Sequence, residues 1–386
     1  MQIFAEKSPN FVQILCQMRR SALLLLVFSL IALASCSDRR YYQVSGYAQG
    51  GTYSIKYRGG DLKPQQVSTL ADSLLNEIDF TLSGYNKNSL LSRLNRGEQV
   101  VLTPMFAEVY RLSYEMWELS DGAFDAACGP LFDIWGFGFT ADQLPSDGQI
   151  ARTLASCGTA RLVGPDIVDS LVRAGLSLTS ADLIAPQTCG FPGPIRGSSP
   201  VLNFNAIAQG YSCDLVYSAL KAHGVTDMLV DIGEIRCCGL NPSGKGWSIG
   251  IDNPVDGNDR PGEDIRQVWS SEGRDCGVVT SGNYRKFYIR DGKKYSHTID
   301  PRTGRPVEHN LLSATVIVPS QSDLLPSTAG ATDPLSDAKS FAAAQADALA
   351  TYFMVIGPDA ASAFLKAHPT LQAFLITEDS VLSFPE

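Results

Sequence analysis

Apolar residues recur along the chain at two spacings, which predict a mixture of helices and strands. Apolar positions three and four residues apart predict a helix over residues 64–80, and alternation predicts a strand over residues 52–57. A second helix is predicted over Pro104–Leu119, with proline in its first turn. Further helices are predicted over residues 147–156, 208–223, 338–356 and 358–367, and further strands over 200–205, 227–232, 246–251, 276–281, 285–290 and 311–319.

The order of these elements predicts the fold class. Strands and helices do not alternate regularly, so a doubly wound parallel sheet is not indicated. We expect an α+β fold, a mixed arrangement with antiparallel sheets and packed helices. Residues 184–200 and 322–337 are rich in Pro, Gly, Ser, Thr and Asp and are predicted to be loops.

A predominantly apolar run near the start of the chain predicts an export signal. Residues 22–34 form this run, and Arg19 and Arg20 precede it. It is too short to cross a bilayer, which takes about 20 residues. The run ends in Leu-Ala-Ser-Cys36, which resembles the bacterial lipobox, whose cysteine is acylated and becomes the new N-terminus. An uncleaved anchor and a chance cysteine are the alternatives.

These features divide the chain into three parts. Residues 1–35 are predicted to be the signal peptide. Our hypothesis is that translation begins at Met18, because residues 1–17 fit a signal poorly. Residues 36–45 are predicted to be the lipidated cysteine and a linker, and residues 46–386 a single catalytic domain. We therefore expect a protein of the bacterial cell envelope, lipid-anchored, most simply at the inner membrane on its periplasmic side.

Charge and cysteine content exclude two classes of function. The chain of 386 residues holds 40 Asp and Glu against 31 Lys and Arg, a net charge of −9, so nucleic acid is not an expected partner. Seven cysteines follow Cys36, without a CxxC pair or a histidine at zinc spacing, so zinc is not expected. Export would permit a disulfide, but the sequence leaves its partners open.

Four segments combine glycines with polar residues, and each is ambiguous by itself. Residues 122–138 are glycine-rich and aromatic, and residues 203–211 are predicted to run from a strand into a helix, a junction that favours phosphate. His297 lies before a Pro and Gly turn and is either a structural histidine or a general base. Asp347 and Thr351 are four apart, which places their oxygens on one helix face and suits Mg²⁺.

Together these segments closely resemble the ApbE family, the FAD:protein FMN transferases of bacterial envelopes. The resemblance is carried by Ser-Gly-Asn-Tyr-Arg285, Ser-His-Thr-Ile-Asp-Pro-Arg-Thr-Gly304 and Ala-Asp-Ala-Leu-Ala-Thr351. It covers residues 46–356, nearly the whole predicted mature chain.

The resemblance implies a set of site residues. It places FAD contacts at Gln49, Tyr85, Ala123, Phe124, Asp125, Asn203, Gln209 and Ile299. It places Mg²⁺ on Asp347, Thr351 and the backbone carbonyl of Ala206. His297, with Asp125 as an alternative, would serve as the catalytic base.

The implied reaction is Mg²⁺-dependent transfer of FMN from FAD to a Thr or Ser hydroxyl of an exported acceptor protein, with release of AMP. The implied acceptor is a subunit of an ion-pumping NADH:quinone oxidoreductase, of an Rnf-type complex or of another exported flavoprotein. An FAD pyrophosphatase and a non-catalytic flavin-binding lipoprotein are the alternatives. The chain departs from the family pattern at Asn203 and Gln209, where the family commonly has an acid and a lysine.

The lipid anchor can be tested directly. Replacing Cys36 by Ser should abolish acylation, because only the thiol accepts the diacylglycerol. Mass spectrometry of the protein from membranes of the producing cells would detect the modification. A Cys36→Ser protein that still carried the lipid would exclude this anchor.

Overall fold

The computed structural model describes residues 40–137, 144–185, 201–255, 257–258, 260, 262–284, 287–290, 293–322, 324–325 and 340–385. The chain divides into two units, Met1–Tyr41 and Tyr42–Glu386. Only Arg40 and Tyr41 of the first unit are described, so the account below concerns the second. Cys36 and the predicted signal peptide lie outside the described residues, as do most residues of the two predicted loops.

Helices and strands follow one another without a repeating pattern. The helices are α2 (Pro64–Leu82), α3 (Leu90–Asn95), α4 (Pro104–Leu119), α5 (Gly129–Ile134), α6 (Asp147–Leu154), α7 (Pro165–Ala174), α8 (Ala208–Ala222) and α9 (Ala342–Ala367). The strands are β1 (Tyr41–Ala48), β2 (Gly51–Gly59), β3 (Val100–Val101), β4 (Ser177–Leu178), β5 (Val225–Asp231), β6 (Ile235–Cys238), β7 (Ser248–Asp252), β8 (Ile265–Ser270), β9 (Cys276–Gly282), β10 (Phe287–Arg290), β11 (Lys293–Ser296), β12 (Ile299–Asp300), β13 (Arg305–Pro306), β14 (Leu311–Pro319), β15 (Gln372–Thr377) and β16 (Val381–Phe384).

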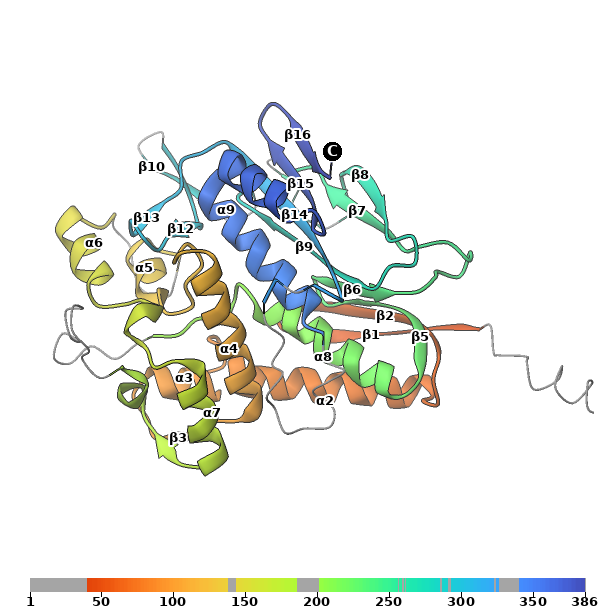
Figure 1. Cartoon of the computed structure of the whole chain (residues 1–386), viewed down its shortest axis with the longest axis horizontal. Coiled ribbons are helices and arrows are strands. Elements are labelled where there is room, and N and C mark those ends of the chain that lie inside the picture. The colour runs from red at the N-terminus through yellow and green to blue at the C-terminus, as the bar shows by residue number, and fades with distance from the viewer. Residues whose placement is uncertain are drawn as a thin grey trace, which may run out of the picture. The chain divides into compact units, whose positions relative to one another are not determined.

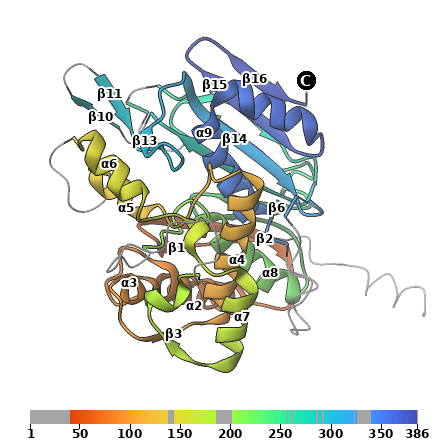
Figure 2. The same ribbon diagram turned by 60° about the vertical axis from the view of Figure 1, so that its left-hand side comes forward.

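One large sheet organises the second unit. Its strand order is β1-β2-β5-β6-β9-β14-β15-β16, and every neighbouring pair from β2 onward is antiparallel. Helices α8 and α9 pack on one face of this sheet, and α2 and α4 pack outside them (Figures 1 and 2). The fold is therefore α+β with antiparallel sheets, which confirms the predicted class.

The β7–β8 hairpin packs on the opposite face. The indole of Trp247 donates to the carbonyl of Cys238 at 2.9 Å, and that of Trp269 donates to Gln372 Oε1 at 3.1 Å. Gln372 alternates with Ala373, a residue of the helix-side core, so its side chain lies on the other face of the sheet. Helices and hairpin thus enclose the central strands from both sides.

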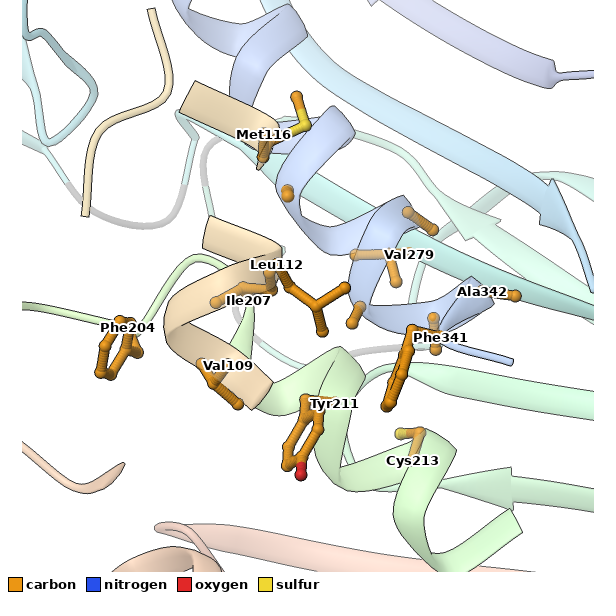
Figure 3. Close-up of a cluster of buried hydrophobic side chains, with 14 of the residues drawn as sticks. Val109, Leu112, Met116, Phe204, Ile207, Tyr211, Cys213, Val279, Phe341 and Ala342 are labelled. Carbon is orange, nitrogen blue, oxygen red and sulfur yellow. The ribbon is translucent and has the colours of Figure 1, made fainter. Parts of the chain in front are cut away.

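Two glycines let the start of α9 lie very close to its neighbours. A Cβ atom on Gly210 of α8 would meet the carbonyl oxygen of Ala343 at 2.2 Å, and one on Gly277 of β9 would meet the N atom of Ala343 at 2.4 Å. Beside this contact the rings of Tyr211 and Phe341 stack with centroids 5.8 Å apart, and side chains of α4 fill the adjoining core (Figure 3). The first turn of α9 is therefore wedged between α8 and the sheet.

A kink divides α9, and a histidine compensates for it. Gly357 has φ +80°, and Pro358 has no N–H for the carbonyl of Met354, its partner in a regular helix. His309 supplies the missing donor, because its Nε2 lies 2.9 Å from that carbonyl while its Nδ1 accepts from the N–H of Leu311. These contacts require the neutral ring, and burial lowers the pKa of His309.

Helix α9 is both long and apolar. Among the described residues it is the helix long and apolar enough to cross a membrane. Residues 342–350 are all buried inside the protein, as expected for the central helix of a folded core.

Most of the long predicted elements are confirmed, and one strand is wrong. Two helices are predicted over residues 338–356 and 358–367, and the non-helical Gly357 divides α9 at this boundary. The strand predicted over 200–205 is absent from its described part, residues 201–205. Asn203 explains the difference, because its side-chain oxygen accepts the N–H of Asn205 at 2.9 Å and closes a local turn.

The close packing of α9 predicts an unusual cost for a helical Gly→Ala change. Gly210→Ala gains up to about 1 kcal/mol of helix propensity, but its methyl group overlaps backbone that cannot rotate away. Overpacking of this kind costs about 1–3 kcal/mol, so urea unfolding should show a net loss of stability. Gly148→Ala in α6 is the control, because its Cβ would meet only the flexible Arg152 at 3.4 Å. Equal changes in the free energy of unfolding for the two substitutions would contradict the close packing of α9 against α8.

Candidate flavin and metal site

Asp347 lies in the second turn of α9 and is 5% exposed. Its Oδ2 accepts the N–H of Gly210 at 3.1 Å. Gly210 is the third residue of α8, so its N–H is among those that have no acceptor within the helix. The Asp347 carboxylate therefore caps the beginning of α8. Within the described residues the Ala206 carbonyl, two residues before α8, accepts no hydrogen bond.

A second buried carboxylate, Asp214 of α8, holds the beginning of α9. Its oxygens accept the N–H groups of Ala343 at 3.1 Å and Ala344 at 2.8 Å, which are among the unpaired donors of a helix N-terminus. The Nε of Arg236 lies 3.0 Å from the same carboxylate, and the Nη1 of Arg236 lies 2.6 Å from Asp275. Asp214 thereby joins α8, α9 and β6 and sets the position of Asp347.

Asp347 and Asp214 differ in the groups that stabilise their charged forms. Burial raises the pKa of both Asp347 and Asp214 to about 7. Arg236 opposes this shift at Asp214, whereas at Asp347 only the Gly210 hydrogen bond opposes it and the charge of Asp214 adds to it. No Lys, Arg or His in the described part of the chain forms an ion pair with Asp347. A cation beside Asp347 would remove this imbalance.

Thr351 follows Asp347 by one helical turn and is half-buried. The backbone of α9 is regular up to Gly357, so both side chains lie on one face as the spacing predicts. In the described ranges no three His, Cys, Asp or Glu residues converge as a metal cluster. The oxygen donors available here are a carboxylate, a hydroxyl and a carbonyl, the kinds that Mg²⁺ takes together with water and phosphate.

The amides of Asn203 and Gln209 each have their own backbone partner. Asn203 accepts from Asn205, and Gln209 Nε2 donates to the carbonyl of Ile232 at 2.8 Å. Gly233 has φ +90°, and a Cβ atom on it would meet Gln209 Nε2 at 2.3 Å, so only glycine fits beside this amide. In the described residues the two amides are not hydrogen-bonded to each other.

Asp125 is held by its own segment. Its carboxylate accepts the N–H of Ala127 at 2.7 Å and both the N–H and the hydroxyl of Thr159, the latter at 2.7 Å. Burial raises the pKa of Asp125, and these hydrogen bonds oppose the shift. The side chains of Ala123 and Phe124 are buried. Their backbone N–H groups donate to the carbonyl and the hydroxyl of Ser120, at 3.1 Å and 2.9 Å.

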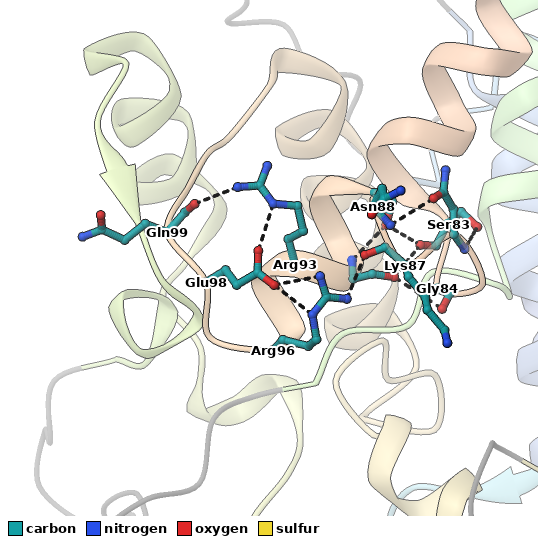
Figure 4. Close-up of polar contacts among 11 residues, drawn as sticks. Ser83, Gly84, Lys87, Asn88, Arg93, Arg96, Glu98 and Gln99 are labelled. Atoms are coloured by element: carbon teal, nitrogen blue, oxygen red, sulfur yellow. Dashed lines mark hydrogen bonds and ion pairs between the residues drawn. The ribbon is translucent and has the colours of Figure 1, made fainter.

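Tyr85 projects from a short loop that is tied down on both sides. Its N–H donates to Ser83 Oγ at 3.2 Å, Ser89 Oγ donates to the carbonyl of Ser83 at 2.6 Å, and Arg96 donates to the carbonyl of Lys87 at 2.8 Å (Figure 4). The side chain of Tyr85 is 67% exposed, so the loop presents an aromatic ring to solvent.

Gln49 occupies the two-residue turn between β1 and β2. Its φ is +52° and that of Gly50 is +80°, which is typical of a type I′ hairpin turn. This turn directs the Gln49 side chain to α8, where Nε2 donates to Ser212 Oγ at 2.6 Å.

His297 and Ile299 flank the start of β12. His297 is half-buried, and its ring lies edge-on to Phe137 with centroids 6.4 Å apart. Ile299 is buried in a small cluster with Trp135, whose indole donates to the carbonyl of Gly304 at 2.7 Å. This packing joins the segment of His297 to the glycine-rich segment that follows Asp125.

The segment 203–212 connects the predicted site residues. It contacts Tyr85 through Asn205 at 3.4 Å, Ala126 through the N–H of Asn203 at 2.7 Å, Gln49 through Ser212, and Asp347 through Gly210. Residues far apart in the sequence therefore surround one strand-to-helix junction. Among the described residues, the packing near Trp135 joins the part of the site around His297 to the segment that follows Asp125.

Sequence reasoning missed the residues that position the ligands. Arg236 stands among apolar neighbours, Ile235 and Cys237, which is a signal for a buried cation, but its partner Asp214 is 22 residues away and not marked by any motif. Gly210 lies in the glycine-containing segment 203–211, but the sequence gives no sign that its N–H donates to Asp347. Thr159 lies outside the four segments that combine glycines with polar residues.

Comparison with known proteins finds relatives over most of the chain. The sequence model of the ApbE family matches residues 49–375. The chain is 33% identical over 304 residues to an FAD:protein FMN transferase of Vibrio cholerae, covering 76% of this chain and 82% of the relative. It is 29% identical over 328 residues to one from Escherichia coli, covering 83% and 78%.

Solved structures show the same relationship. The flavin transferase ApbE from Vibrio cholerae superposes with a TM-score of 0.66 at 28% identity, covering 89% of this chain and 96% of that one. The apo form of the Pseudomonas stutzeri flavinyl transferase ApbE gives a TM-score of 0.67 at 28% identity, covering 90% and 95%.

The raised pKa of Asp347 predicts how stability depends on pH without metal. Between about pH 4 and about pH 7 the folded state keeps a proton that the unfolded state has lost, so the free energy of unfolding falls as the pH rises. Asp347→Asn should show a smaller fall in urea unfolding with EDTA between about pH 5 and about pH 7. Asp359→Asn, exposed on the same helix, is the control. An unchanged fall in Asp347→Asn would show that this carboxyl ionises normally.

Proposed function

This chain belongs to the ApbE family, and we propose that it is an Mg²⁺-dependent enzyme that attaches FMN to a Thr or Ser hydroxyl of a protein. Flavin transfer from FAD is the activity that the names of its relatives give. The metal, the hydroxyl acceptor and the release of AMP are the further parts of the proposal.

The observation that carries the proposal is the buried carboxylate of Asp347, which has no cationic partner among the described residues. The Ala206 carbonyl, which the family resemblance places at the metal, accepts no hydrogen bond among the described residues. Together with the Thr351 hydroxyl they are suited to hold Mg²⁺, and water and phosphate would complete its shell. Bound there, the ion would neutralise charge on the FAD pyrophosphate.

The protein's own groups would bind and orient FAD around segment 203–212. The positive end of the α8 dipole lies at this segment and would favour a pyrophosphate. Two of its N–H groups are already engaged, that of Ala208 by the carbonyl of Phe204 and that of Gly210 by Asp347. Tyr85 and Gln49 lie on loops that contact the same segment, at Asn205 and Ser212. Binding would thus draw on four stretches of chain that one junction brings together.

His297 is our choice for the group that takes the proton from the acceptor hydroxyl. The oxygen of that hydroxyl would bond to the FMN-side phosphorus as the pyrophosphate bond breaks and AMP leaves. Asp125 is less suited as a base, because its carboxylate is already engaged by Ala127 and Thr159. Phe137 lies beside the histidine ring and would limit its rotation.

The acceptor and the location follow from the predicted leader. We propose that the enzyme is exported and held to the periplasmic side of the membrane by a lipid on Cys36. Its acceptor would then be an exported protein or an outward-facing domain, such as a subunit of an ion-pumping redox complex.

One assay separates the three readings of this site. The purified protein is incubated with FAD, Mg²⁺ and a candidate acceptor, and AMP, free FMN and in-gel flavin fluorescence are measured. A fluorescent acceptor band with an equal amount of AMP supports the transferase. Free FMN and AMP without a fluorescent band would indicate a pyrophosphatase, and FAD binding without AMP a non-catalytic flavoprotein.

The metal ligands predict a graded loss of activity. Loss of groups that merely orient ligands typically costs about 10–100-fold, so Asp347→Ala should lower transfer by more than about 100-fold at limiting Mg²⁺. Thr351→Ala should cost less, because water can replace a hydroxyl ligand. Initial rates across a Mg²⁺ titration measure both effects, with Asp359→Ala on the same helix as the matched control. Wild-type rates in Asp347→Ala would eliminate the site.

A further inference from the structure

Two buried thiols face each other across neighbouring strands, away from the proposed reaction. Cys237 of β6 and Cys276 of β9 are direct partners in the antiparallel register. Their Sγ atoms lie 3.8 Å apart, and the residues are 0% and 1% exposed. Neither residue belongs to the segments that would bind FAD or metal.

The backbone already has the spacing that a disulfide requires. Directly opposite residues in an antiparallel pair have Cα atoms about 4.5–5.5 Å apart, and disulfides span about 4.4–6.8 Å. The sulfur atoms must approach by roughly 1.8 Å to reach the bond length of about 2.05 Å. Side-chain rotation supplies such a movement without displacing the strands.

Other cysteines of the described chain do not compete for this contact. Cys238 follows Cys237 and points to the opposite face of the sheet, where its thiol bonds the carbonyl of Thr226 at 3.4 Å. The thiol of Cys213 bonds the carbonyl of Glu234 at 3.0 Å, and that of Cys128 bonds the carbonyl of Asp125. The register therefore selects one pair where the sequence left the partners open.

We propose that Cys237 and Cys276 form a cross-strand disulfide when the chain folds in the presence of a disulfide donor. One thiolate attacks the donor disulfide and forms a mixed disulfide, which the second thiol resolves. The two cysteines lose two electrons and two protons, and the donor leaves as two thiols. Because both thiols are buried in the folded protein, the exchange takes place during folding. This covalent site goes beyond the proposed flavin transfer.

The bond would lie directly beside the support of α9. Arg236 and Asp275, the neighbours of the two cysteines, form an ion pair at 2.6 Å. Gly277, next to Cys276, is the glycine against which the first turn of α9 rests. The disulfide would therefore link the two strands that hold the start of the helix carrying Asp347.

The test is refolding under two redox conditions. Reduced, urea-unfolded protein is refolded in a buffer of oxidised and reduced glutathione, and in parallel with excess reductant. Free thiols are alkylated, the protein is digested with trypsin, and peptides are identified by mass spectrometry. Trypsin leaves Cys237 and Cys238 on one peptide, 237–245, and Cys276 on another, 275–285. Substitution must therefore distinguish the two adjacent cysteines.

Cys238→Ser is the matched control for Cys237→Ser. The wild type and Cys238→Ser should give the linked peptides in the glutathione buffer, reducible with dithiothreitol and absent in the reductant arm. Cys237→Ser should lose them, and Cys237→Ala provides a second variant if the serine protein does not refold. Alkylated Cys237 and Cys276 in refolded wild type, or linkage that survives in Cys237→Ser, would overturn the proposal. The transfer assay is independent of this result.

Discussion

The position of the candidate site depends on one buried carboxylate, that of Asp214. Its two oxygens receive the first N–H groups of α9 and the guanidinium of Arg236. A charge buried without partners costs several kcal/mol, so this one is tolerated only because a helix N-terminus and an arginine both supply positive potential. Without the arginine the charge of Asp214 would be only partly compensated, because the helix N-terminus alone offsets only part of it.

The consequence of this ion pair reaches a residue that it does not contact. Asp214 fixes where α9 begins, and Gly210 and Gly277 allow the helix to lie directly against α8 and β9. Asp347 then accepts the N–H of Gly210, one of the donors at the start of α8 that have no acceptor within the helix. The arrangement of oxygens at the candidate metal site is thus a result of packing around the first turn of one helix.

The sequence predicted those features that depend on local periodicity. The long helices α2, α4 and α8 and the strand β14 follow from apolar spacing, and the common face of Asp347 and Thr351 follows from helix geometry alone. The strand at 200–205 was wrong because a side chain of Asn203 competes with backbone pairing. Helices α3 and α5 are too short to show a period. Helix α7 does show one, at Ile167, Val168, Leu171 and Val172, and the sequence prediction missed it.

Contacts between distant residues were beyond such reasoning. Gly210 and Asp347 are 137 positions apart, and Cys237 meets Cys276 only because two strands adopt one register. No pattern within either strand specifies that register, which is set by how the helices and the β7–β8 hairpin cover the sheet. The sequence therefore singled out Asp347 and Thr351 as candidates but not the groups that hold them in place.

The two departures from the family pattern now have a physical interpretation. The Asn203 oxygen accepts a backbone N–H as an aspartate would, and the Gln209 amide donates to a carbonyl as a lysine would. Because the resemblance replaces an acid and a base together, the net charge around segment 203–212 does not change. The neutral amides form the turn at Asn203 and the contact of α8 with Ile232 without a formal charge at this partly buried junction.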